Sequence, residues 1–170
     1  VVTIKPMQLY IIRHGIAAEK TEYKNDEERP LIDKGRQKTE KVAQRLLEIG
    51  IHFDLMLTSP LVRAKQTAEI LQKNGLSDEL QEFSALAPDG NIQEWVNWWL
   101  ESSYNLEESC LALVGHEPDL GHWAETLIWG QPHDKLVLKK SGVIGLELPV
   151  GSDPIGKSNL FLLTSPKWLF

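Results

Sequence analysis

Short apolar runs alternate along the chain with longer segments whose apolar residues recur at helical spacing. Short runs of this kind, bounded by polar residues or turn formers, are typical of strands buried inside a sheet. We predict strands at Gln8–Ile12, Leu55–Thr58, Gln81–Leu86, Leu111–Val114, Leu136–Leu138, Val143–Leu148 and Leu160–Leu163. The tail is rich in strands joined by turns, so part of the sheet is expected to be antiparallel.

The first segment with helical spacing runs from Asp33 to Gly50. Aspartate caps helix N-termini well, and glycine is common just after the last turn of a helix. Val42, Leu46 and Ile49 form the apolar stripe of this predicted helix.

Three more helices are expected further along the chain. Ser59–Pro60 begins the first, because serine is a good cap and proline is tolerated at the first helical position. Asn74–Gly75 is its stop signal. The other two helices cover Ile92–Ser102 and Pro118–Trp129, whereas the polar, mostly acidic stretch Glu19–Arg29 is interpreted as a loop.

Strands that alternate with helices predict a layered α/β sheet with crossover connections. The length of 170 residues, with 42% hydrophobic and 25% charged residues, is ordinary for one domain, and we expect residues 1–170 to form it. In such folds, ligands bind where the carboxyl ends of strands meet loops and helix N-termini.

Charge and cysteine content exclude several classes of function. Lysine and arginine total 18 against 24 acidic residues, and this net charge of −6 argues against a general nucleic-acid binder. An anionic substrate is not excluded, because a few arginines in a cleft can reverse the local potential. Cys110 is the only cysteine, so no disulfide within the chain and no cysteine-based zinc site is expected, and a cytoplasmic location fits best.

No membrane segment is predicted from the sequence. The chain has no apolar run of the roughly 18 residues that a membrane span needs. The N-terminal stretch VVTIKPMQLYIIRHG is interrupted by Lys5 and Pro6 and is not followed by a small-residue cleavage site, so we do not interpret it as a signal peptide.

Three basic clusters each follow a predicted strand. They contain Arg13 with His14, then Arg63, and finally His116. Parallel strands would carry these four side chains to the same edge of the sheet, where two cations and two imidazoles repel each other unless an anion lies between them. A tetrahedral phosphoryl group suits such a site, because arginine pairs with phosphate oxygens in two-point contacts.

Each cluster taken alone has an ordinary structural interpretation. Arg13-His14-Gly15 would be a surface turn, Arg63 a solvated helix residue, and His116 a histidine whose hydrogen bonds are satisfied at a strand end. The joint occurrence of three basic clusters, each at the carboxyl end of a strand, is much harder to reach by accident.

The segments LYIIRHG, LTSPLVRAKQTAEIL and LALVGHEPDL, which span Leu9 to Leu120, resemble the three signature segments of the histidine phosphatase superfamily, also called phosphoglycerate-mutase-like. Their order and spacing match as well. The short chain, with RPLIDKG after the first segment and LAPDG between the second and third, is most similar to the SixA-type phosphohistidine phosphatases.

This resemblance implies a role for each basic residue. His14 would be the nucleophile that takes the phosphoryl group, and Arg13 and Arg63 would bind its oxygens. His116 would be the second histidine, which contacts the phosphoryl group and stabilises charge in the transition state. The implied fold is a three-layer α/β/α sandwich with a mostly parallel mixed sheet, and no metal or cofactor is implied.

The chemistry of the side chains is consistent with these roles. His14 must be neutral to attack phosphorus, and the nearby Arg13 and Arg63 are expected to lower its pKa from about 6.5. Its other ring nitrogen should donate to a backbone carbonyl and so fix the tautomer. Gly15 would let the loop approach the phosphate closely. Water would then hydrolyse the phosphohistidine in a second step.

The leaving group separates the candidate substrates. A sugar alkoxide needs a proton from a general acid, and Asp89 is the nearest candidate, although Pro-Asp-Gly is also a common turn. Phosphohistidine needs less help, so a site weak in general acid favours it. The short chain leaves little room for a lid, and an open site admits a histidine on a partner protein. Arg29 either guides the substrate or is a solvated loop residue.

The function predicted from the sequence is therefore hydrolysis of phosphohistidine on a protein, in signal transduction. The partner is a histidine-phosphorylated protein domain, and neither nucleic acid nor a membrane is expected as a partner. Two alternatives stay open. One is a small-molecule phosphomonoesterase that uses the same nucleophile on a phosphorylated metabolite. The other is a non-catalytic module that binds phosphohistidine.

Three further motifs are interpreted as structural. Gly151–Ser158 matches the phosphate-binding pattern G-x-x-x-x-G-K-[ST], but a strand rather than the required helix is predicted after it, so we expect a turn. His116 and His122 are six residues apart and do not share a helical face, which argues against zinc. The tryptophans at helical spacing are expected to pack in the core or an interface rather than form a ligand platform; they are Trp95, Trp98 and Trp99.

Overall fold

The computed structural model of the chain describes residues 5–170. Residues 1–4, which belong to the N-terminal stretch that we do not interpret as a signal peptide, lie outside the described residues. From residue 5 onward, no helix has both the length and the apolar character that a membrane span requires.

A six-stranded sheet with the order β3-β2-β4-β1-β5-β6 forms the centre of the structure. Its strands are β1 Met7–Arg13, β2 Leu55–Thr58, β3 Leu80–Glu82, β4 Cys110–Gly115, β5 Val143–Leu148 and β6 Asn159–Thr164. The first four strands in that order pair in parallel, whereas β5 pairs antiparallel with β1 and β6 pairs antiparallel with β5. The prediction of a mixed sheet with an antiparallel part in the tail is therefore confirmed.

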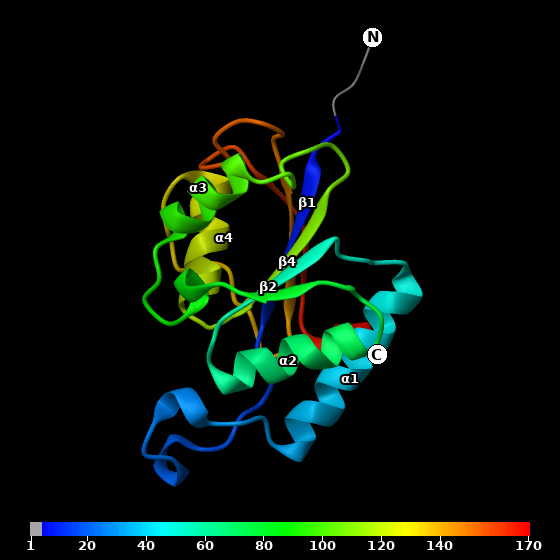
Figure 1. The fold of residues 1–170 in the computed structure, drawn as a ribbon, viewed down its shortest axis with the longest axis vertical. Coiled ribbons are helices and arrows are strands. Elements are labelled where there is room, and N and C mark those ends of the chain that lie inside the picture. Colours follow the sequence, from blue (N-terminus) through cyan, green and yellow to red (C-terminus); the bar gives the residue numbers. More distant parts are fainter. Residues whose placement is uncertain (1–4) are drawn as a thin grey trace.

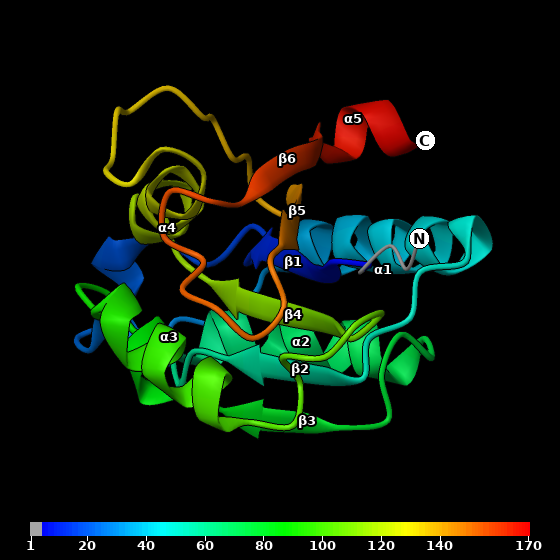
Figure 2. The same ribbon diagram turned by 90° about the horizontal axis from the view of Figure 1, so that it is seen from above.

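Helices cover both faces of the sheet, as Figures 1 and 2 show. The longer helices are α1 Asp33–Ile49, α2 Val62–Lys73, α3 Ile92–Glu101 and α4 Asp119–Trp129, and α5 Pro166–Leu169 is a single turn. Because side chains alternate along β1, Leu9 and Ile11 pack with α3 and α4, whereas Tyr10 and Ile12 pack with α1 and α2. The three-layer α/β/α sandwich is confirmed.

Two helix starts and one stripe residue differ from the sequence prediction. Asp33 is the first residue of α1 rather than its cap, and Ile32 precedes it without a side-chain cap. Ile49 is 53% exposed, so the apolar stripe of α1 stops one turn earlier, while Gly50 ends the helix in the left-handed conformation as expected. Ser59 does not begin α2, which starts at Val62. The buried Ser59 hydroxyl accepts from the Leu61 amide at 3.2 Å and contacts a histidine described below.

Two predicted strands also differ, because their backbone groups bind elsewhere. The segment 81–86 forms only the short β3, and a 3-10 turn at Ser84–Leu86 follows it. Leu136–Leu138 is not a strand. The Leu136 amide donates to the buried carboxylate of Glu125, which also accepts from the amides of residues 133–135, and the Leu138 carbonyl accepts from Arg13 Nη1, so neither group is available to a sheet.

The three structural interpretations of motifs can be compared with the fold. Residues 151–158 form turns that lead into β6, so the helix that a nucleotide-binding loop needs does not follow. His122 pairs with Asp134 at 2.6 Å on the surface and not with the other histidine of its motif. Trp95 and Trp99 are fully buried and stacked with their ring centroids 5.8 Å apart, so core packing is confirmed for them.

Candidate active site

The three basic clusters meet at the carboxyl ends of β1, β2 and β4, at the lower end of the sheet in Figure 1. The backbone amide of His14 donates to the Gly115 carbonyl at 3.0 Å, and that of Ser59 donates to the Val114 carbonyl at 2.9 Å. These bonds hold the loops together just beyond the strands. The loops line a cavity of about 460 Å³, which we call the strand-end cavity.

Arg13, His14, Arg63 and His116 all line the strand-end cavity. The convergence expected from the sequence is therefore present. Segment 17–20 and the loop that contains Asp26 form another part of its wall, so the site has more cover than the short chain suggested.

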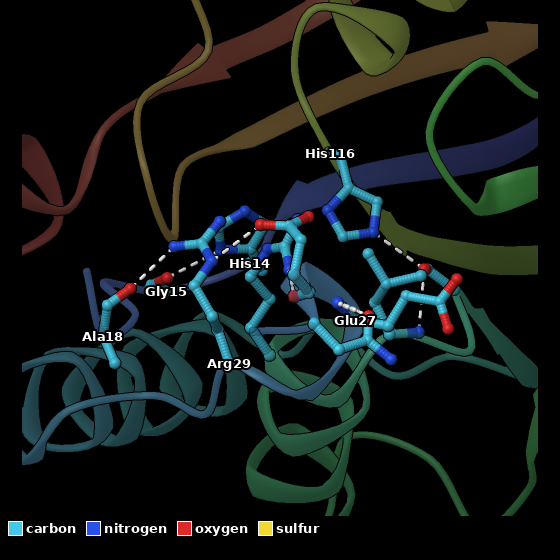
Figure 3. A network of polar contacts seen from close by, with 11 residues as sticks. His14, Gly15, Ala18, Glu27, Arg29 and His116 are labelled. Atoms are coloured by element: carbon cyan, nitrogen blue, oxygen red, sulfur yellow. Dashed lines mark hydrogen bonds and ion pairs between the residues drawn. The ribbon is translucent and has the colours of Figure 1, made fainter. Parts of the chain in front are cut away.

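The two imidazole rings lie side by side, with centroids 5.2 Å apart (Figure 3). Only 7% of His14 and 3% of His116 is exposed. His14 Nδ1 lies 2.7 Å from the Gly15 carbonyl oxygen, which can only accept, so Nδ1 carries the proton of the neutral ring. The lone pair of Nε2 is then available for attack. His116 Nε2 contacts the Ser59 hydroxyl at 2.7 Å.

Both imidazoles are held in the neutral form. Burial lowers the pKa of His14 to about 3, and the charges of His116, Arg63 and Arg13 act in the same direction, against the hydrogen bond to Gly15. Burial also lowers the pKa of His116 to about 4, helped by Arg63. The sequence pointed to the arginines as the cause, but the loss of hydration has the larger effect on the pKa of both rings.

The Arg63 guanidinium is held by a residue that the sequence did not single out. Its Nη1 donates to the Asp26 carbonyl at 2.8 Å and its Nη2 to the Asp26 carboxylate at 3.0 Å. Arg29 Nε donates to the same carboxylate at 2.7 Å. Burial raises the pKa of Asp26, but the bonds and charges of the two arginines outweigh it and keep the pKa below its usual value. Asp26 therefore positions both guanidinium groups.

Three buried polar atoms at the site have no hydrogen-bond partner among residues 5–170. They are Arg13 Nε, Arg63 Nε and His116 Nδ1, and the fourth such atom, Trp95 Nε1, lies in the core. A buried polar group without a partner costs about 1–3 kcal/mol. An anion in the strand-end cavity is the ligand that would best supply partners to these guanidinium groups.

Comparison with known proteins identifies the family. The family model of the histidine phosphatase superfamily (branch 1) matches residues 9–109. The chain belongs to the histidine phosphatase superfamily. An uncharacterized protein of Picosynechococcus sp. is 49% identical over 164 residues, which cover 96% of this chain and 99% of the relative.

Solved structures of phosphatases share the fold. The protein histidine phosphatase SixA complexed with tungstate matches with a TM-score of 0.83 at 23% identity, over 96% of this chain and 100% of that chain. Phosphoserine phosphatase from Entamoeba histolytica with 3-phosphoglyceric acid matches with a TM-score of 0.70 at 18% identity, over 96% and 100%. His116 lies outside the segment that the family model matches, and β4 places it beside His14.

The structure also places the two secondary site residues that the sequence suggested, Arg29 and Gly15. Arg29 is part of the wall: its side chain is only 11% exposed and donates to the Ala18 carbonyl at 2.7 Å (Figure 3). Gly15 does not line the cavity, and its amide donates to Thr67 Oγ1 at 3.0 Å. A glycine fits there because an added Cβ would lie 2.7 Å from Thr39 Oγ1.

Glu117, and not Asp89, is the carboxyl group beside His116 in the wall of the cavity, where Glu19 and Asp26 are the other acidic residues. Asp89 is exposed and does not line the strand-end cavity, and its backbone amide donates to the Asp119 carboxylate at 2.8 Å. Glu117 lines the cavity, and burial raises its pKa despite the bond from the Gly121 amide. Its place directly after His116 was the available sequence signal. From residue 5 to 170, no cluster of three or more His, Cys, Asp or Glu side chains could hold a metal.

The lowered pKa values of His14 and His116 predict that stability depends on pH. The unfolded chain protonates both rings below about pH 6.5, whereas the folded protein does not. Because the unfolded state then binds more protons, the free energy of unfolding falls as the pH drops from about 6.5 towards 4. We expect His116→Gln to lower the number of protons taken up on unfolding by about one, which reduces the slope of the unfolding free energy against pH. Urea unfolding across that pH range measures the slope. An unchanged slope in the variant would contradict the neutral His116.

Proposed function

We propose that the chain is a phosphatase that passes a phosphoryl group to His14 and then to water. The observation that carries this proposal is the convergence of two buried, neutral imidazoles and two guanidinium groups on one cavity, with three of their polar atoms left without partners. Neutral His14 supplies the electron pair, and the cations and His116 supply the charge stabilisation that phosphoryl transfer needs.

The reaction proceeds in two displacements. His14 Nε2 forms a bond to phosphorus while the bond to the leaving group breaks, and the leaving group takes the electron pair. A phosphohistidine ring already carries its proton, whereas an alkoxide would take one from a carboxyl group such as Glu117. Arg13, Arg63 and His116 stabilise the charge on the equatorial oxygens. A water oxygen then attacks phosphorus, the N–P bond breaks, and the free imidazole and inorganic phosphate are released. All these groups belong to the protein, so we expect turnover to be unchanged by a metal chelator.

Phosphohistidine on a protein is the substrate that we propose. The similarity of the whole fold to the protein histidine phosphatase SixA supports it. The chemistry agrees, because an imidazole protonated near pH 7 leaves phosphorus as a neutral group with little help. The direct test compares kcat/KM for a phosphohistidine peptide with that for a sugar phosphate; a higher value for the sugar phosphate would reject this substrate. A cytoplasmic location and a role in signal transduction stay predictions.

A small phosphomonoester is the second candidate substrate, and Glu117 favours it. The sequence suggested a site weak in general acid, but the cavity contains a carboxyl group whose pKa burial raises. A carboxyl that keeps its proton to higher pH can donate it to an alkoxide leaving group. The weakness in general acid therefore no longer separates the two substrate classes.

Replacing Glu117 with glutamine is expected to slow hydrolysis of a sugar phosphate by about 10²-fold, because the alkoxide then leaves without a proton. Hydrolysis of phosphohistidine should change much less, because its leaving imidazole is neutral. Steady-state rates on both substrates measure the difference. Asp89→Asn is the matched control, and a larger loss in that variant would show that Asp89 and not Glu117 is the acid.

A further inference from the structure

A second cavity of about 440 Å³ lies next to the strand-end cavity. The two cavities share Arg13 and Lys140 in their walls, so they are adjoining parts of one surface. The second cavity is lined by five basic residues, Arg13, Lys38, Lys139, Lys140 and Lys167, and by no acidic residue. We call it the basic pocket.

The basic pocket is unusual for this chain, whose net charge is −6. Its lysines come from three segments: Lys38 from α1, Lys139 and Lys140 from the loop before β5, and Lys167 from α5. Within residues 5–170, none of these four lysines forms a salt bridge. Their charges are therefore available to an external anion.

The loop that carries Lys139 and Lys140 is fixed to the catalytic segment. The Ser141 amide donates to the carbonyls of Arg13 at 3.1 Å and His14 at 3.2 Å, and the Arg13 amide donates to the Gly142 carbonyl at 3.2 Å. Arg13 Nη1 also donates to the carbonyl of Leu138, one residue before the lysine pair, at 3.0 Å. The backbone of the pocket is thus positioned relative to the nucleophile without a ligand.

We propose that the basic pocket binds acidic side chains on the surface of a phosphorylated protein whose phosphoryl group occupies the strand-end cavity. This proposal rests on the proposed function for the nature of the substrate. An acidic partner would be repelled by the chain as a whole, and a cluster of unpaired lysines beside the nucleophile reverses the potential where the partner must dock. Ile16 and Pro166 line the pocket between the cations and can contact the methylene groups of acidic side chains.

Two synthetic peptides of the same length test the proposal. Each carries one phosphohistidine, which is flanked by glutamates in the first peptide and by glutamines in the second. The wild-type protein is expected to have a KM about tenfold lower for the glutamate peptide, and this preference should decline with added salt. Lys139→Glu/Lys167→Glu should remove the preference and leave kcat and the glutamine-peptide KM unchanged. Lys73→Glu, one such charge reversal at the far end of α2, is the control for each of the two substitutions and should keep the preference.

Three results would overturn the proposal. The double variant could keep the preference for glutamate, or wild type could show none although it hydrolyses both peptides. The third result concerns two small substrates, a sugar bisphosphate and the matching monophosphate. If wild type prefers the bisphosphate and the double variant loses that preference but keeps its preference for the glutamate peptide, the pocket binds a second phosphate instead. If wild type releases phosphate from neither peptide but hydrolyses sugar phosphates, the proposed protein substrate fails; if it hydrolyses none of them, the phosphatase assignment fails.

Discussion

Replacing His14 with alanine is expected to abolish phosphate release, with a loss in kcat of about 10³-fold or more. The reason is chemical, because Nε2 of this ring is the nitrogen whose electron pair is free to attack phosphorus, its Nδ1 proton being held by the Gly15 carbonyl. The second imidazole of the cavity, His116, has its Nε2 bonded to the Ser59 hydroxyl, and we assign it to charge stabilisation instead. The measurement is the rate of phosphate release under saturating substrate.

The same variant separates an enzyme from a binding module. Arg13, Arg63 and His116 remain in the His14→Ala protein, so phosphate should still bind, and titration calorimetry with inorganic phosphate measures this. A variant that binds phosphate and does not turn over substrate supports the phosphatase. Equal turnover by the wild type and the alanine variant would remove His14 as the nucleophile.

Replacing Arg63 with alanine is expected to lower kcat/KM by about 10²–10³-fold, the usual cost of losing a charged donor at a developing negative charge. Only 4% of Arg63 is exposed, and its Nε is a buried donor without a partner. The Asp26 carboxylate also loses one of its two cationic partners. Steady-state kinetics on a phosphohistidine peptide measures the effect.

Two matched variants show whether the effect of Arg63 is specific. Arg63→Lys keeps the charge but loses the planar fork of donors, so we expect it to recover only part of the activity. Arg45→Ala removes an arginine on α1 that is half exposed and paired with Glu48, and its activity should equal that of wild type. Full activity in Arg63→Ala would contradict a role in binding the phosphoryl group.

The parts of the site that were predictable follow strands directly in the sequence. Arg13, His14 and His116 come at or just after the ends of buried apolar runs, and parallel pairing of β1 with β4 is enough to bring them to one edge. Short apolar runs and a left-handed glycine after α1 are local features, so the pattern of residues reveals them. The mixed sheet and the layers could be predicted for the same reason.

The parts that were not predictable depend on contacts between distant segments. Asp26 lies in an acidic loop with no pattern of its own, and only the fold places it against Arg63. Ser59 has the sequence of a helix cap, but its buried hydroxyl contacts His116, 57 residues away. Glu125 accepts the amides of residues 133–136 and so holds the start of the predicted strand 136–138 away from the sheet. In each case a polar group found its partner through the tertiary structure, which the local sequence does not reveal.

The most direct test of the account is to trap the covalent intermediate. Brief incubation with a labelled phosphoryl donor, followed by rapid denaturation in alkali, should leave one label that is stable to base and labile to acid, as expected for phosphohistidine. Peptide mapping should place it on His14, and it should be absent from the His14→Ala protein. A label on His116 or on any other residue, or no label in a protein that is turning over substrate, would contradict the account.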